Sequence, residues 1–350
     1  MTNPASFAYY TLTQRWLQVV ERVRADGGWP IAVQRELQAL QADLPHGAVR
    51  SLPNSDRGID RDRWQTWIAP YLGQPWLEVP WFLAETYFYR LILGITGYFD
   101  PEAIGVQRDP FHSVKQTGLQ EAIAATRTVA ATLNRWMDGV SYSPVPWDQT
   151  VMTELMYGAL WGNQADLSLR PGADLQLHLV TPSLAQQILV NDTAMVLTDW
   201  AGRDRDRIDI ITDNAGVELI ADLFLAYALV ITGRVGRVTL HLKAHPTFVS
   251  DATVADVHHT LHSLVAADPD HPDQAQLESL VLELIAYLDR GQIRCQTHWF
   301  WTSPLAMWDL PTDLRTDLAQ ASWVMVKGDA NYRRLLGDRQ WPFTTPFAEI

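Results

Sequence analysis

The spacing of hydrophobic residues divides the chain into two parts. In the first part, apolar residues recur every three or four positions, which is the spacing of one face of a helix. Prolines and small polar residues separate the segments that show this pattern. We expect helices at residues 10–23, 31–44, 64–72, 79–95 and 120–137, and in the segment that ends at Trp161. Residues 1–170 are therefore predicted to form a helical N-terminal part.

Short runs rich in β-branched and apolar residues follow in the second part. We expect strands at residues 208–212, 237–242, 293–296 and 323–326. Segments of helical spacing accompany them, at residues 184–200, 219–227, 254–265 and 277–288. Strands that alternate with helices favour a mostly parallel sheet with helices on both faces. We therefore predict an α/β fold whose core spans residues 171–350, although one continuous domain would also fit this length.

The strongest functional signal lies between the first strand and the helix that follows it. Asp213 and Asn214 sit at the carboxyl end of this strand, which is where open α/β sheets bind ligands. The start of the helix also offers unpaired N–H groups that suit a phosphate. Either side chain could cap the helix, but capping needs only one of them. We therefore expect a site here, with helix capping as a second role.

Acids or amides follow two other strands as well. Asp251 lies a few residues past the second strand, and Asp329 and Asn331 lie past the fourth. The carboxyl ends of parallel strands can converge on one crevice. Two carboxylates and an amide oxygen are hard ligands that suit Mg²⁺ or Mn²⁺. Together with Asp213 and Asn214, these side chains predict a metal site.

Cationic side chains next to the last strand indicate a phosphate. Lys327 and Arg333 flank the Asp329 segment, and arginine can hold a phosphate through two parallel hydrogen bonds. Gly328 between them allows a close approach of the backbone. In the aromatic-rich helix of the first part, Glu85 and Arg90 are the polar side chains that could face a site.

Two further groups favour structural roles. His258, His259 and His262 form a His-His-x-x-His group, but no glutamate follows the first histidine as a zinc protease requires. We interpret them as an exposed helix face, with metal binding as the alternative. Cys295, the single cysteine, lies in a predicted strand and is expected to be a buried structural thiol rather than a nucleophile.

Composition and charge exclude several classes of protein. The chain has 350 residues, of which 47% are hydrophobic and 19% charged, as in a folded domain. Its net charge of −13 argues against a nucleic-acid-binding surface. No stretch approaches the roughly 18 apolar residues of a membrane span, and the N-terminus shows no targeting pattern. We expect a cytoplasmic protein that binds neither nucleic acid nor membrane.

Several segments resemble the signatures of a known family. Thr-Asp-Asn-Ala-Gly-Val-Glu-Leu at residues 212–219, Phe-Val-Ser-Asp-Ala-Thr at 248–253 and Lys-Gly-Asp-Ala-Asn-Tyr-Arg at 327–333 look like motifs of the metal-dependent damage-control phosphatases. The most similar branch was once described as an acidic-residue (protein-glutamate) methyltransferase. Residues 6–9, 81–90, 161–168 and 337–341 also match, and all these segments follow the family's order along the chain. The resemblance therefore spans nearly the whole chain.

This resemblance implies a Rossmann-like three-layer α/β/α core with a helical N-terminal part. It also implies a divalent metal, Mn²⁺, Co²⁺, Ni²⁺ or Mg²⁺, and hydrolysis of small phosphorylated metabolites such as fructose 1-phosphate and fructose 6-phosphate. Asp213, Asn214 and Asp251 match the metal ligands of the family. The positions that match its substrate-binding or cofactor-binding segments are Asp329, Asn331, Arg333, Glu218, Asn163 and Asp166.

The resemblance leaves alternatives open. Glu218 matches a position assigned to S-adenosylmethionine, so a protein carboxyl methyltransferase is the second enzymatic interpretation. The branch also carries an Arg-Thr-x-Lys motif beyond the position of Ile350, and its lysine reaches the substrate. The residues before Ile350 contain no such motif. Either the chain has lost this motif or its sequence continues beyond Ile350, and a metabolite-binding protein without turnover is the non-enzymatic alternative. Asn163 and Asp166 also fit a turn after the helix end at Gly162.

Overall fold

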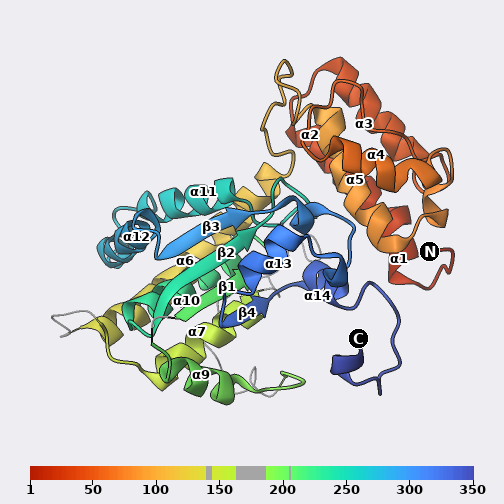
Figure 1. The fold of residues 1–350 in the computed structure, drawn as a ribbon. Coiled ribbons are helices and arrows are strands. Elements are labelled where there is room, and N and C mark those ends of the chain that lie inside the picture. The colour runs from red at the N-terminus through yellow and green to blue at the C-terminus, as the bar shows by residue number, and fades with distance from the viewer. Residues whose placement is uncertain (139–143, 163–186, 205) are drawn as a thin grey trace.

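Four parallel strands form the centre of the fold, in the order β3-β2-β1-β4 (Figure 1). The computed structural model describes residues 1–138, 144–162, 187–204 and 206–350. The strand bounds are β1 Asp206–Ile211, β2 Val235–Leu242, β3 Ile293–Thr297 and β4 Trp323–Val326. All four predicted strands are present, and the prediction of a parallel sheet is confirmed.

Helices cover both faces of this sheet. Ile208 and Ile210 of β1 belong to a core cluster shared with helices α6, α7, α9, α10, α11 and α12. Ile211 points the other way, because side chains alternate along a strand, and packs with Phe300, Trp301 and Leu314 of α13. The predicted α/β/α layering is therefore confirmed. The bounds are α6 His112–Met137, α7 Gln149–Trp161, α9 Thr193–Ala201, α10 Val217–Ile231, α11 Val254–Val265, α12 Gln274–Asp289 and α13 Thr312–Leu318.

The N-terminal helices have a second core of their own, which lies to one side of the sheet (Figure 1). Its centre is aromatic: the Trp16 ring stacks on Phe88 at 4.3 Å and meets Trp76 edge-on at 5.7 Å. Val249, from the loop after β2, is buried in this same core. The helices are α1 Phe7–Tyr10, a π-helical turn Thr11–Arg15, α2 Trp16–Asp26, α3 Ile31–Asp43, α4 Arg61–Ile68 and α5 Trp81–Thr96.

Some element bounds differ from the sequence-based expectation. The helix expected from residue 184 begins only at Thr193. The Oδ1 atom of Asn191, just before this helix, accepts a hydrogen bond from the Thr193 N–H. Two short helices, α13 and α14 (Asp329–Leu335), were not predicted, because seven residues show too little periodicity. The division at residue 170 lies outside the described residues and stays a prediction. Both α6 and α7, which precede it, pack with the sheet.

None of the described helices combines the length and hydrophobicity that crossing a bilayer requires.

Candidate active site

A cavity of about 330 Å³ opens where the carboxyl ends of β1 and β2 meet the N-terminal helices. The sheet side of its wall contributes Asp213, Asn214, Ser250 and Asp251. The α14 region contributes Asp329 and Arg333. Segments from the first hundred residues complete it with Phe7, Arg15, Trp81, Glu85 and Tyr89. The cavity is therefore built from three distant parts of the sequence.

Backbone pairing brings the predicted metal ligands together. Asp213 follows β1 after a single residue, and Asn214 forms an isolated antiparallel bridge with Asp251. Two hydrogen bonds of 2.7 Å flank this bridge, from the Ala215 N–H to the Ser250 carbonyl and from the Ala252 N–H to the Asp213 carbonyl. The strand ends thus converge as the sequence predicted.

The loop that carries Asp251 adopts an unusual conformation. Phe248 and Val249 have φ angles of 49° and 71°, which are rare for bulky or β-branched residues. Their side chains pack into the N-terminal core, with the Phe248 ring 5.2 Å from Tyr89. Burial of these two side chains offsets the backbone strain, and the loop holds Ser250 and Asp251 at the cavity.

Asn214 has a defined amide orientation. Its Nδ2 donates to Asp213 Oδ2 and to Glu218 Oε2, both at 2.9 Å. Its Oδ1 accepts from the Ser250 hydroxyl at 2.6 Å. Neither Asp213 nor Asn214 caps α10, since the N-cap is Gly216 without a side-chain hydrogen bond. The predicted capping role is therefore wrong, and the two side chains are directed to the site instead.

Lys243 belongs to this site although the sequence analysis did not select it. Its ammonium lies 2.8 Å from Asp251 Oδ2 and 3.9 Å from Asp213 Oδ1, and it is only 2% exposed. It places a positive charge beside two carboxylates that would otherwise repel each other. Lys243 directly follows β2, so the strand-end signal that identified Asp213 could have found it.

Arg333 lines the cavity, and its guanidinium lies close to three acidic side chains. Its Nη1 lies 2.6 Å from Glu85 Oε2, and its Nε donates to Asp338 Oδ1 at 2.8 Å. Asp329, which is mostly exposed, lies 3.6 Å away. Burial raises the pKa of Glu85, and the Arg333 charge opposes this rise. Of the two candidates in α5, Glu85 therefore faces the site, whereas Arg90 is buried between Asp56 and Asp60.

Three predicted substrate residues do not line the cavity. The Lys327 ammonium is buried against Glu218 and Asp222, at 2.8 and 2.6 Å. Asn331 is fully buried and donates to the carbonyls of Thr212 and Lys327. Glu218 is 1% exposed and contacts Asn214 from behind. Asn163 and Asp166 lie outside the described residues, so their roles stay predictions.

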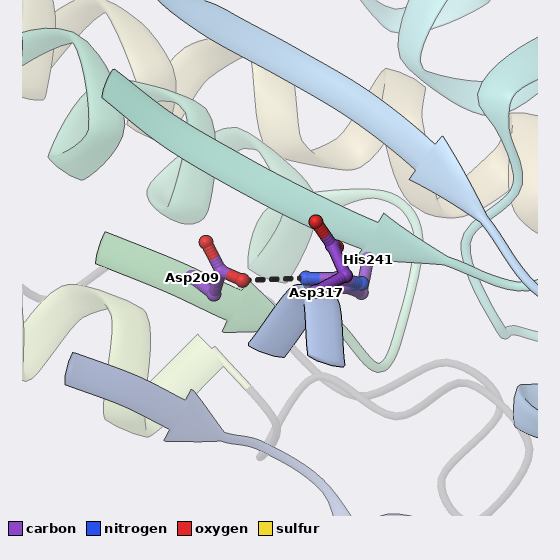
Figure 2. A group of neighbouring side chains, drawn as sticks. All are labelled: Asp209, His241 and Asp317. Atoms are coloured by element: carbon purple, nitrogen blue, oxygen red, sulfur yellow. Dashed lines mark hydrogen bonds and ion pairs between the residues drawn. The ribbon is translucent and has the colours of Figure 1, made fainter. Parts of the chain in front are cut away.

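A second group of potential metal ligands lies on the face of the sheet that α13 covers. Asp209, His241 and Asp317 bring ligand atoms within 4.8 Å of one another (Figure 2). However, the Arg207 guanidinium donates to both carboxylates, at 2.7 Å to Asp209 and 2.9–3.0 Å to Asp317. The arginine already supplies the positive charge that the acids require. We therefore interpret this group as a structural ion-pair network.

The groups assigned structural roles from sequence agree with the structure in part. His258 and His262 are exposed, as expected for a solvent-facing side of α11, whereas His259 is half-buried, with its ring 5.3 Å from that of His112. Thr253 caps the start of α11 through a reciprocal capping box with Asp256. Cys295 is half-buried rather than buried as predicted, but desolvation raises the pKa of its thiol to about 11, which leaves it a poor nucleophile.

The sequence is similar to proteins of one family along almost its full length. The family profile described as the damage-control phosphatase ARMT1-like domain matches residues 12–350. Proteins named damage-control phosphatase ARMT1 are 31% identical in Danio rerio, over 88% of this chain and 71% of that protein, and 33% identical in Xenopus laevis, over 85% and 71%. The human protein of the same name is 30% identical, over 88% and 72%.

A solved DUF89 family protein from Pyrococcus horikoshii is also similar, with 14% identity and a TM-score of 0.46 over 95% of this chain and 86% of that one. The profile match and the relatives agree with each other over nearly the whole sequence. The chain therefore belongs to the ARMT1-like damage-control phosphatase family, and it is an enzyme of the phosphatase class.

Proposed function

We propose that this protein hydrolyses small phosphorylated sugars with a divalent metal held by Asp213, Asn214 and Asp251. The observation that carries the proposal is the convergence of these oxygen donors, with Arg333, on one 330 Å³ cavity. Two carboxylates and an amide oxygen fit a hard cation such as Mn²⁺ or Mg²⁺. Lys243, already beside both carboxylates, indicates that this wall favours positive charge.

The metal, when bound, would neutralise phosphate oxygens as the phosphoryl group is transferred. The residues of the chain would hold and orient the reactants. Arg333 lines the same cavity and would contact the phosphate, while Glu85 and Asp338 hold its guanidinium in place. Lys243, buried beside Asp251 and Asp213, adds a positive charge next to these carboxylates. Without cations, Asp213 and Asp251 would repel a phosphate.

We propose sugar phosphates such as fructose 1-phosphate or fructose 6-phosphate as substrates. A volume of about 330 Å³ suits a ligand of this size, since small-molecule sites run from roughly 300 to 1,000 Å³. Glu85 and Asp329 offer carboxylate acceptors for hydroxyl groups, and the Trp81 and Tyr89 rings offer apolar surface for a sugar face. These features support a polar, anionic metabolite rather than an apolar ligand.

Methyl transfer is the less favoured alternative. Glu218, the position associated with S-adenosylmethionine, is buried and engaged by Asn214 and Lys327. The turn after β1 contains one glycine and two oxygen ligands rather than the glycine-rich turn of a nucleotide site. A pair of carboxylates near an anionic substrate is explained by a metal, which methyl transfer does not need.

Phosphate release from a panel of sugar phosphates, with and without added metal, tests the proposal. We expect chelation to abolish release and Mn²⁺ or Co²⁺ to restore it, with no methyl transfer to protein carboxylates above a control without enzyme. Unchanged turnover after exhaustive chelation, verified by metal analysis, would contradict the metal site. Tight binding of a sugar phosphate without release would favour a metabolite-binding protein.

A further inference from the structure

A chain of buried charged groups holds Asn214 from behind. Asp222 Oδ1 lies 2.6 Å from the Lys327 ammonium, which lies 2.8 Å from Glu218 Oε1. The other oxygen of Glu218 accepts from Asn214 Nδ2 at 2.9 Å. We propose that Glu218 and Lys327 are positioning residues that fix which end of the Asn214 amide faces the metal. This inference rests on the proposed metal site.

The amide of a metal-binding asparagine must be turned the right way. Only Oδ1 has lone pairs for a cation, since Nδ2 is a donor. In Asn214 both Nδ2 hydrogens meet carboxylates, from Asp213 and Glu218. A flipped amide would place Oδ1 against these two anionic oxygens, which is repulsive. Glu218 therefore turns Oδ1 toward Ser250, on the cavity wall.

Glu218 is itself held in place by buried charge. It is 1% exposed, and a buried carboxylate needs a paired counter-charge. Lys327, also buried, supplies the counter-charge, and Asp222 holds Lys327 from its far side. Burial alone would lower the pKa of Lys327, but these two acids outweigh it and the net pKa is raised.

The same contacts also tie β4 to α10, so a purely structural role must be distinguished. The chain offers a matched control in Lys115, which is equally buried and pairs with Asp109 and Asp256 at 2.9 and 2.8 Å. Removing the Lys115 charge breaks two buried ion pairs with acids that are not proposed metal ligands. A stability effect common to both lysines can thus be separated from an effect on metal binding.

Mn²⁺ affinity, measured by electron paramagnetic resonance of the free ion, tests the positioning role directly. In Glu218→Gln, one amide oxygen must serve both Lys327 and Asn214, and its NH₂ group faces a donor. We expect the Mn²⁺ Kd to rise by about 10- to 100-fold, as for other residues that orient metal ligands. Lys327→Met should raise the Kd by at least about tenfold, and Lys115→Met by less than about twofold.

A double-mutant cycle adds a readout that a structural role would not change. If Glu218 acts through Asn214, Glu218→Gln should have little further effect on the Mn²⁺ Kd in an Asn214→Ala background. An equal fold-change in both backgrounds would overturn the positioning role. Circular dichroism verifies that each variant is folded, and Lys327→Met carries the same expectation if Glu218→Gln does not fold.

Failure of the proposed function gives a different result. If the wild-type protein binds no Mn²⁺, or if Asp213→Ala binds it as tightly as wild type, the metal site is wrong and the positioning role falls with it. If Asp213→Ala loses Mn²⁺ while folded Glu218→Gln and Lys327→Met keep wild-type affinity, only the positioning role is overturned.

Discussion

Gly328→Ala tests how closely the last strand passes the proposed metal site. Gly328 has φ 85° and ψ 159°, a region almost restricted to glycine that costs other residues about 1–3 kcal/mol. A Cβ there would lie 1.9 Å from Asp213 Cγ and 2.1 Å from its Oδ2. Ordinary contacts begin at 3.4 Å, so the Asp213 carboxylate or the backbone must move by about 1.5 Å.

Such a shift exceeds what a metal ligand tolerates. Ligand distances in metal sites hold within about 0.2 Å, so an Asp213 carboxylate displaced by this clash would no longer bind the ion correctly. We expect Gly328→Ala to raise the Mn²⁺ Kd and to lower phosphate release by about 100-fold. The backbone strain and overpacking together should destabilise the fold by about 2–6 kcal/mol. Metal titration, a sugar phosphatase assay and urea unfolding measure the three effects.

Gly73→Ala is the matched control. Gly73 also has a positive φ, of 80°, but a Cβ added there meets nothing within 4 Å. It should therefore show backbone strain alone, with wild-type Mn²⁺ affinity and phosphate release. If folded Gly328→Ala also kept wild-type affinity and activity, Asp213 would not be a metal ligand or the close approach would be wrong.

Two further predictions separate site residues from scaffold. Asp213→Ala and Asp251→Ala should each lower phosphate release by at least about 100-fold while the fold survives, because a metal ligand is lost. His258→Ala and His262→Ala should change it little, and a larger loss from the histidine variants would show that the metal is assigned to the wrong residues. The pKa of Cys295 is raised from 9.0 to about 11, so its thiolate fraction at pH 8 falls about 100-fold. Alkylation should be slower by about that factor in the folded protein than in urea, and equal rates would contradict the raised pKa.

Local pattern alone determined most of the elements. β4 at Trp323–Val326 and α11 at Val254–Val265 have the predicted bounds, because each is bounded by strong local signals. The polar residues at the strand ends were likewise visible, since parallel strands present their carboxyl ends at one edge. Asp213, Asn214 and Asp251 therefore converge as expected. These inferences needed only sequence spacing and the geometry of a parallel sheet.

Only the tertiary structure decided which polar side chains face the cavity. Lys327 and Arg333 looked equivalent in sequence, yet Lys327 turns inward to Glu218 while Arg333 turns to Glu85, from a helix more than two hundred residues earlier. Lys243 joined the site without being predicted. The direction of a long charged side chain depends on which counter-charges the fold brings near it. That pairing is made by segments distant in the chain, so periodicity and local motifs cannot specify it.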